Sequence, residues 1–168
     1  MSEIRGVITA LATAFRPDGE LDVDSTRKLA AHLVENGSHG LVVAGTTGES
    51  PTLEDDEKID LLKGVIAEVG SEVTVILGTG SNDTRHSVNL TNMAAEAGAD
   101  AGLIVTPYYN RPSQDGIYAH FAHLAERSDL PIIVYNVPGR TVTDILPETM
   151  ARLAAIPVFL ILAFESGD

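Results

Sequence analysis

The chain has 168 residues, of which 44% are hydrophobic and 21% are charged, and this composition is that of a globular protein, not a disordered one. The formal net charge is −13, and a field of that sign repels nucleic acid and anionic membranes. No apolar run approaches the roughly 20 residues of a membrane span, and the first residues do not resemble a signal peptide. The absence of cysteine excludes disulfides and thiolate chemistry. We expect a single cytoplasmic domain over residues 1–168, without nucleic-acid or membrane partners.

Short apolar runs alternate with amphipathic stretches along the whole chain. The apolar runs lack polar alternation and are therefore typical of buried strands; they lie at residues 6–13, 40–44, 73–77, 101–106, 130–135 and 158–163. Helices are predicted between them, from a cap at Asp24-Ser25 to Asn36-Gly37, and over about 53–70, 83–97, 117–127 and 147–153.

Strands that alternate with helices predict a parallel sheet in an α/β fold. Two architectures fit this order: an open doubly wound sheet, for which the length is natural, and a (β/α)₈ TIM barrel, which usually needs about 250 residues. In both, the loops that follow the strands bear the functional residues. The unusual residues of this chain lie in those loops, at 46–47, 78–82, 108–111 and 135–140, and this clustering predicts an active site there.

The stretch Gly45-Thr46-Thr47-Gly48 follows the predicted strand at 40–44 directly. Pro51 comes shortly after it and suits the first turn of a helix. A strand, a glycine turn and a helix N-terminus together would direct free amide groups and the positive end of a helix dipole at one point. A carboxylate or a phosphate would fit there. A plain tight turn with threonine caps explains the six residues from Gly45 to Ser50 equally well.

Tyrosines and an arginine mark the later loops. Tyr135 ends a predicted strand and faces the mouth of the sheet, Tyr109 lies in a long loop, and Arg140 follows Tyr135 by five residues. Each alone has an ordinary structural explanation. Together with Thr46 and Thr47 they form a hydroxyl-rich site with one guanidinium, which can pass a proton between hydroxyls and hold carboxylates without a metal.

Two weaker patterns predict no cofactor. His120 and His123 are three residues apart on a predicted helix, but no acid or cysteine accompanies them, so a solvated helix face is favoured over a metal site. Gly78-Thr79-Gly80 lacks the third glycine of a dinucleotide-binding loop. We therefore expect neither a metal nor a cofactor.

Four motifs resemble one known family. They are Gly6–Leu11, Gly45–Ser50, Val105–Pro112 and Tyr135–Thr141, in order and at fitting spacings. Their residues are similar to those of the dihydrodipicolinate synthase and N-acetylneuraminate lyase family, which are class I aldolases. The resemblance implies an incomplete (β/α)₈ barrel with about six strands and five helices, and it favours the barrel over the open sheet.

The resemblance also implies roles for single residues. Thr47 matches the residue that holds the pyruvate carboxylate, beside the amides of the turn between Gly45 and Gly48. Thr46, Tyr135 and Tyr109 match a proton-relay triad. Tyr109 would reach its site across a dimer interface, so a homo-oligomer, a dimer or a tetramer, is expected.

The second substrate is implied in the same way. Arg140 matches the residue that holds the carboxylate of L-aspartate semialdehyde, which favours the synthase branch, in lysine biosynthesis, over the sialic acid lyase branch. Asn82 matches a position that binds inhibitory lysine in some members. His86 stands where a carboxylate would be expected, so feedback by lysine is not predicted.

The chain departs from the family at the lysine on which the chemistry depends. That lysine attacks the keto carbon of pyruvate, and the imine makes the methyl carbon nucleophilic. With the final Ser166-Gly167-Asp168 as anchor, its position holds Ala163, and a methyl group cannot form an imine. All three lysines lie within the first 63 residues. The chain is therefore predicted to be inactive as a Schiff-base lyase.

The second departure is length, because the chain stops after the sixth predicted strand of an eight-stranded barrel. Strands one and six would then be open edges, which promote pairing with a partner or self-association. Besides the synthase reaction, three functions stay open. They are a related pyruvate-dependent aldolase acting on a 2-keto-3-deoxy sugar acid or N-acetylneuraminate, a keto-acid-binding chain without turnover, and a self-associating fragment.

Overall fold

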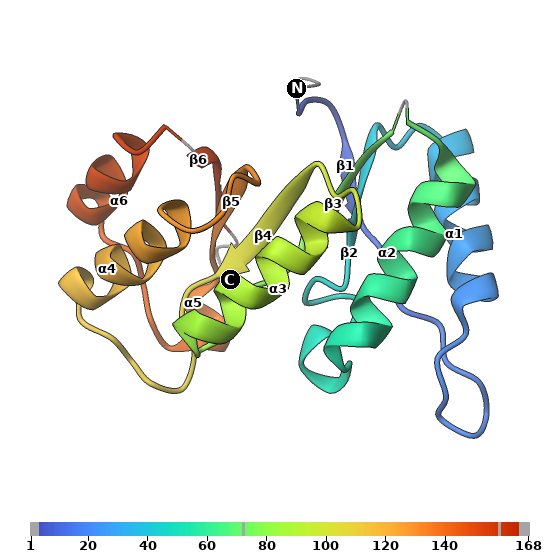
Figure 1. Ribbon diagram of the computed structural model, residues 1–168, viewed down its shortest axis with the longest axis horizontal. Helices are drawn as coiled ribbons and strands as arrows, with labels where there is room; N and C mark the ends of the chain where they lie inside the picture. Colours follow the sequence, from blue (N-terminus) through green and yellow to red (C-terminus); the bar gives the residue numbers. More distant parts are fainter. Residues whose placement is uncertain (1–3, 72, 158, 165–168) are drawn as a thin grey trace. The chain divides into compact units, whose positions relative to one another are not determined.

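The computed structural model describes residues 4–71, 73–157 and 159–164, and Figure 1 labels their helices and strands. The chain divides into two compact units. Unit one consists of the residues up to Gly78 together with Met93–Asp100, and unit two consists of Thr79–Asn92 and the residues from Ala101 onward.

Unit one contains three parallel strands, β1 (Ile8–Ala10), β2 (Gly40–Val43) and β3 (Thr74–Gly78), in the order β1-β2-β3. The register places Ile8 opposite Gly40 and Val43 opposite Leu77. Most residues of β2 and β3 are buried, which is why their sequences are nearly continuous apolar runs.

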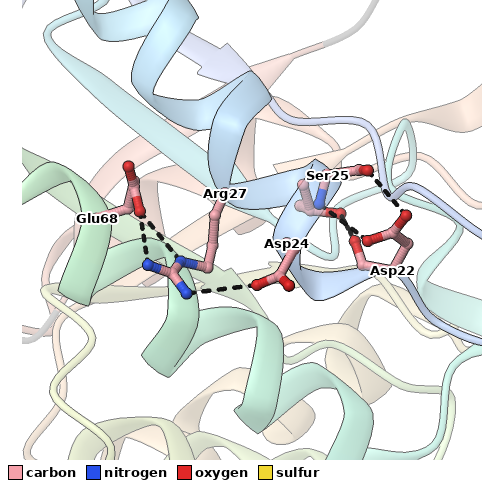
Figure 2. Close-up of polar contacts among 6 residues, drawn as sticks. Asp22, Asp24, Ser25, Arg27 and Glu68 are labelled. Atoms are coloured by element: carbon pink, nitrogen blue, oxygen red, sulfur yellow. Dashed lines mark hydrogen bonds and ion pairs between the residues drawn. The ribbon is translucent and has the colours of Figure 1, made fainter.

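Helices α1 (Val23–Glu35) and α2 (Asp55–Val69) pack side by side in this unit (Figure 1). Arg27 links them: its Nε and Nη2 donate to Oε2 of Glu68 at 3.1 and 2.8 Å, and its Nη1 lies 3.5 Å from Oδ1 of Asp24 (Figure 2). Because these groups are partly exposed, the network contributes little free energy and mainly aligns the two helices.

The N-terminal cap of α1 is Asp22, so the predicted cap at Asp24-Ser25 was wrong by two residues. Oδ1 of Asp22 accepts from the Ser25 N–H at 2.9 Å, and Oδ2 accepts from the Ser25 hydroxyl at 2.8 Å (Figure 2). The Ser25 amide and then its hydroxyl lower the pKa of Asp22. A capping oxygen reaches an amide three residues later, and Asp24 is already inside the first turn.

Unit two contains the parallel strands β4 (Ala101–Val105), β5 (Ile132–Asn136) and β6 (Phe159–Phe164), in the order β4-β5-β6. A shift of register between Ile132 and Ile133 precedes the pairing of Tyr135 with Ala163. Only the backbone of β6 is described.

The helices of unit two cover a buried apolar cluster. The helices are α3 (Thr84–Glu96, whose last turn lies in unit one), α4 (Gln114–Ala125), the short α5 (Pro138–Thr141) and α6 (Pro147–Ala154). The cluster consists of Val88, Ile104, Ile117, Phe121, Leu124, Ile132, Val134, Ile145, Met150 and Leu153.

The predicted α/β order with parallel strands is confirmed, and the differences lie at the ends of elements and in one additional short helix. The first strand is three residues long and not eight, since Gly6 has a left-handed backbone with φ 81°. The fourth helix begins at Gln114 because Ser113 caps it. Helix α5 falls in a predicted loop. Among the described residues, no helix is long and apolar enough to cross a membrane.

Candidate active site

The turn after β2 presents free hydrogen-bond donors in unit one. Gly48 N–H and Ser50 N–H donate to the Gly45 carbonyl at 3.1 and 3.3 Å, which closes the turn. Thr46 and Thr47 are exposed, and within the described part of the chain neither their amides nor their hydroxyls donate a hydrogen bond. Two N–H and two O–H groups thus remain for a ligand, as an anion requires.

Two glycines allow the backbone to come close behind this turn. A Cβ on Gly48 would lie 2.9 Å from the carbonyl oxygen of Leu11, and a Cβ on Gly78 would overlap the carbonyl oxygen of Ala44. Ala44 itself has φ 48°, in the left-handed region. Thr13 adds a hydrogen bond of 2.7 Å to the Gly48 carbonyl. The turn is therefore held tightly from inside the unit while its threonines face solvent.

The predicted contribution of a helix dipole to this turn was wrong. Pro51 belongs to a 3₁₀ turn of three residues, Ser50–Thr52, and α2 begins only at Asp55. The start of α2 is closed by a capping box in which Glu54 N–H donates to the Glu57 carboxylate at 2.8 Å. Anion binding at Thr46 and Thr47 depends on the amides and hydroxyls of the turn alone.

Tyr135 and Ala163 are neighbours in the sheet of unit two. Tyr135 lies near the end of β5, half-buried, and its register partner in β6 is Ala163. In a parallel pair, register partners lie on adjacent strands at about 4.8 Å spacing. The anchor Ser166-Gly167-Asp168 lies outside the described residues.

Tyr109 projects from a strained loop. Tyr109 and Arg111 both have left-handed backbones, with φ 67° and 48°, and the Tyr109 residue is 89% exposed. Asn110 lies between them, and its Nδ2 donates to the carbonyl of Asn82 at 2.9 Å. Non-glycine residues hold such conformations at a cost of about 1–3 kcal/mol each, and they cluster at functional sites. Tyr109 therefore extends away from its own unit.

Arg140 lies in α5, and its side chain is exposed. Within the described ranges it has neither an ion pair nor a hydrogen bond from its guanidinium. The five donors of this group are therefore available for a carboxylate. The residue after α5, Val142, is 65% exposed and has φ 55°.

The candidate residues are divided between the two units. Unit one holds Thr46 and Thr47 with Gly45 and Gly48, and unit two holds Tyr109, Tyr135, Arg140 and Ala163. Within unit two, Tyr109 follows the end of β4 and Arg140 follows the end of β5, as predicted, whereas Tyr135 is the penultimate residue of β5 itself.

Sequence analysis missed a buried amine, Lys58 of α2, which is 6% exposed. Its Nζ lies 3.8 Å from Oδ1 of Asp55. Burial lowers the pKa of Lys58, and the negative charges of Asp55, Glu54 and Glu57 oppose that shift. The signal was present in its spacing, because Lys58 stands three and four residues before Leu61 and Leu62, on the buried face.

The prediction that His120 lies on a solvated helix face was wrong. His120 is 5% exposed, its Nδ1 lies 2.8 Å from the Thr84 hydroxyl, and its Nε2 is buried without a partner among the described residues. It borders a cavity of about 850 Å³ that Asn82, Asn110 and His123 also line. Burial, and to a lesser degree the charge of His123, lowers the pKa of His120 to about 4.

The stability of the chain should therefore depend on His120 at mildly acidic pH. Between pH 6.5 and about 4 the imidazole binds a proton in the unfolded chain but not in the folded one. Its contribution to the free energy of unfolding is complete above pH 6.5 and falls with pH, by up to about 1.4 kcal/mol per pH unit. Urea unfolding of wild type and His120→Gln from about pH 7 to pH 5 should show a steeper decline for wild type. Parallel pH profiles would contradict the prediction.

Comparison with known sequences gives a consistent result. A model of the dihydrodipicolinate synthetase family matches residues 3–168. The 4-hydroxy-tetrahydrodipicolinate synthase of Desulforamulus reducens is 52% identical over 163 residues, covering 96% of this chain and 55% of the relative. That of Corynebacterium diphtheriae is 51% identical over 168 residues, covering 100% and 56%. The chain thus spans about half the length of the curated relatives it matches.

Solved structures agree with the sequence relatives. A chloride-inhibited dihydrodipicolinate synthase from Acinetobacter baumannii, in complex with pyruvate, superposes with a TM-score of 0.95 at 43% identity, over 98% of this chain and 57% of that one. The lysine-bound enzyme of Cyanidioschyzon merolae gives 0.93 at 45% identity, over 96% and 56%. The fold is accordingly of the (β/α)₈ barrel type, incomplete, with six strands among the described residues. The chain belongs to the dihydrodipicolinate synthetase family.

Proposed function

We propose that this chain is the substrate-holding part of a 4-hydroxy-tetrahydrodipicolinate synthase, which binds pyruvate without forming the imine. The observation that supports this most directly is the Thr46-Thr47 turn, whose amides and hydroxyls remain free for a ligand while the glycines behind it hold its backbone. The family membership supplies the substrate class, since a structural relative is described in complex with pyruvate.

The turn suits the carboxylate of pyruvate because carboxylate oxygens accept several hydrogen bonds at once. The Thr46 and Thr47 amides and the Thr47 hydroxyl would donate to it. The turn from Gly45 to Gly48 contains no cationic side chain, so neutral donors of the turn would hold the anion. Binding without a covalent bond should therefore be weak, with a dissociation constant on the order of 1 mM.

Arg140 would hold the second substrate, L-aspartate semialdehyde, by its carboxylate. A guanidinium pairs with a carboxylate through two parallel hydrogen bonds, and that of Arg140 is exposed and unpaired within the described residues. Tyr135, Thr46 and Tyr109 would be the proton-relay residues of this site, in a relay that needs no metal and that would have no proton to pass without the imine. A guanidinium placed for the carboxylate of L-aspartate semialdehyde favours the synthase over an aldolase that acts on sugar acids.

The relay requires a homo-oligomer, because Tyr109 would act in the site of a second copy. Its 89% exposure and left-handed backbone support this role, because the side chain of such a residue makes few stabilising contacts within its own unit. One structural relative is described as a monomeric variant, so assembly differs within the family. A cytoplasmic location stays a prediction.

The covalent step is the part that this chain would lack. Imine formation needs a neutral amine beside the keto carbon of pyruvate. The register partner of Tyr135 in β6, where the resemblance places that amine, is Ala163. Pyruvate would then bind and dissociate unchanged.

Calorimetric titration of the chain with pyruvate tests this proposal. Wild type should bind pyruvate at millimolar concentration, and Thr47→Val, which keeps the shape and removes the hydroxyl, should weaken binding about tenfold. Thr52→Val is the matched control, because the Thr52 hydroxyl donates only to the Glu49 carbonyl, at 2.9 Å. An absence of both heat and thermal shift with wild type would reject the proposal.

A further inference from the structure

One buried side chain at the end of β5 hydrogen-bonds to the far end of the loop that follows the strand. Asn136, the last residue of β5, is 1% exposed. Its Nδ2 donates to Oδ1 of Asp144 at 2.8 Å, and its Oδ1 accepts from the Ile145 N–H at 3.3 Å. The segment between these contacts contains α5 and Arg140. Asn136 therefore joins the two ends of the segment that holds the candidate carboxylate-binding group.

The partners determine the orientation of the Asn136 amide. A backbone N–H can only donate, so the Asn136 oxygen faces Ile145, and the Asn136 nitrogen then faces the Asp144 carboxylate. Both ends of the amide are used, and neither contact survives if the amide turns over. A side chain in this arrangement selects one loop conformation, since a flipped amide would leave a buried donor unpaired.

A second amide holds the same residues from the side of α4. Nε2 of Gln114 donates to the Asp144 carbonyl at 2.8 Å, and its Oε1 accepts from the Leu146 N–H at 3.1 Å. Gln114 is the first residue of α4. Residues 144–146 are thus fixed by a strand and by a helix at once.

This double attachment explains how a strained backbone persists next to Arg140. Val142 is β-branched and has φ 55°, a conformation such residues rarely adopt. The neighbouring hydroxyls support it, because Thr141 Oγ1 donates to the Thr143 carbonyl at 2.9 Å and Thr143 Oγ1 donates to the Thr141 carbonyl at 3.3 Å. Strain of this kind remains only where the surroundings determine the conformation.

We infer that Asn136 is a positioning residue for Arg140: its bonds to Asp144 and Ile145 hold α5 in the orientation in which Arg140 binds the substrate carboxylate. The inference rests on the proposed function, in which Arg140 binds the second substrate. Rigid placement matters here because a two-point guanidinium–carboxylate contact loses most of its strength when the donors are displaced by about 1 Å. Asn136 thereby sets affinity for the second substrate without touching it.

Exchange of the two side chains tests the bond directly. Asn136→Asp places a carboxylate against that of Asp144, and Asp144→Ala removes the acceptor at an exposed residue. The double variant Asn136→Asp/Asp144→Asn restores the hydrogen bond in the reverse direction, with the donor at position 144 and the acceptor at position 136. Asn36→Asp is the charge-matched control, since Asn36 is exposed and lies in unit one.

The first measurement is amide hydrogen exchange, which needs no ligand. The amides of Arg140 and Thr141 donate to the Val137 carbonyl, and that of Val142 donates to the Pro138 carbonyl. In both single variants these three amides should exchange about tenfold faster, with the amides of α4 unchanged as a check of folding. The double variant should return to the wild-type rates. Unchanged rates in the single variants would overturn the inference.

The second measurement is titration with succinate semialdehyde, which has the aldehyde and carboxylate of the second substrate. The single variants should bind it about tenfold more weakly and bind pyruvate as wild type does, while the double variant recovers. If Asn136 had a purely structural role, the single variants would bind both ligands more weakly or neither. Either result would overturn the inference. If Arg140→Ala binds the aldehyde as well as wild type does, the assignment of Arg140 is wrong, and the proposed function fails on that point. If Arg140→Ala weakens binding and Asn136→Asp does not, only the role of Asn136 is wrong.

Discussion

Borohydride reduction in the presence of pyruvate should leave the mass of this chain unchanged. The reagent traps an imine between a lysine and the keto carbon, and in our proposal Ala163 occupies the family's amine position. Lys28 and Lys63 are exposed on helices α1 and α2, and neither belongs to the proposed pyruvate site. Intact mass spectrometry before and after reduction makes the measurement, and the synthase reaction should be undetectable in the same sample.

The matched variant is Ala163→Lys, which restores an amine at the position that pairs with Tyr135. This variant should acquire one reduced pyruvate adduct, which peptide mapping places at residue 163. An adduct on wild type would contradict the prediction. Lys58 is the residue to examine first, because burial lowers the pKa of its amine and raises the neutral fraction.

Gly78→Ala should destabilise unit one and weaken pyruvate binding together. The added Cβ would overlap the Ala44 carbonyl oxygen, so either β3 or the turn after β2 must move. Overpacking of this kind costs about 1–3 kcal/mol of unfolding free energy. Ala44 precedes the Thr46-Thr47 turn directly, and its displacement would move the amides that we propose to bind the carboxylate. Urea unfolding and pyruvate titration measure the two effects.

Gly139→Ala is the matched control for the stability measurement. A Cβ on Gly139 would meet no atom within 4 Å, so the free energy of unfolding should change by less than about 0.5 kcal/mol. If Gly78→Ala were as stable as Gly139→Ala, the backbone contact between β3 and the turn would not be tight in solution. If Gly78→Ala were unstable yet bound pyruvate normally, the turn would not depend on that contact.

The candidate site could be predicted from the sequence to the extent that it depends on strand ends. An unbroken apolar run predicts a strand of a parallel sheet, and the residue after such a run lies at the functional edge. Thr46, Tyr135 and Arg140 were located by this reasoning, and the structure places each at or after the end of a strand. The roles of these side chains came from the resemblance and stay proposals.

Residues whose roles depend on contacts between distant segments could not be predicted. Asn136 is separated from Asp144 by eight residues, and no periodic pattern shows that its amide points back to the loop. His120 was assigned to a solvated face because spacing does not reveal that the Thr84 hydroxyl lies against it. Lys58 is the exception, since its place on the apolar face of α2 was visible in its spacing to Leu61.

The sequence by itself determined the order of strands and helices and the family to which the chain belongs. These follow from periodicity and residue identity, which are local properties of the chain. Only the tertiary structure decided that α2 begins well after the Thr46-Thr47 turn, that His120 and Lys58 are buried, and that the Asn136 amide bonds to Asp144 and Ile145. Burial and hydrogen bonding over long separations depend on which segments meet, and that is settled by packing of the whole unit.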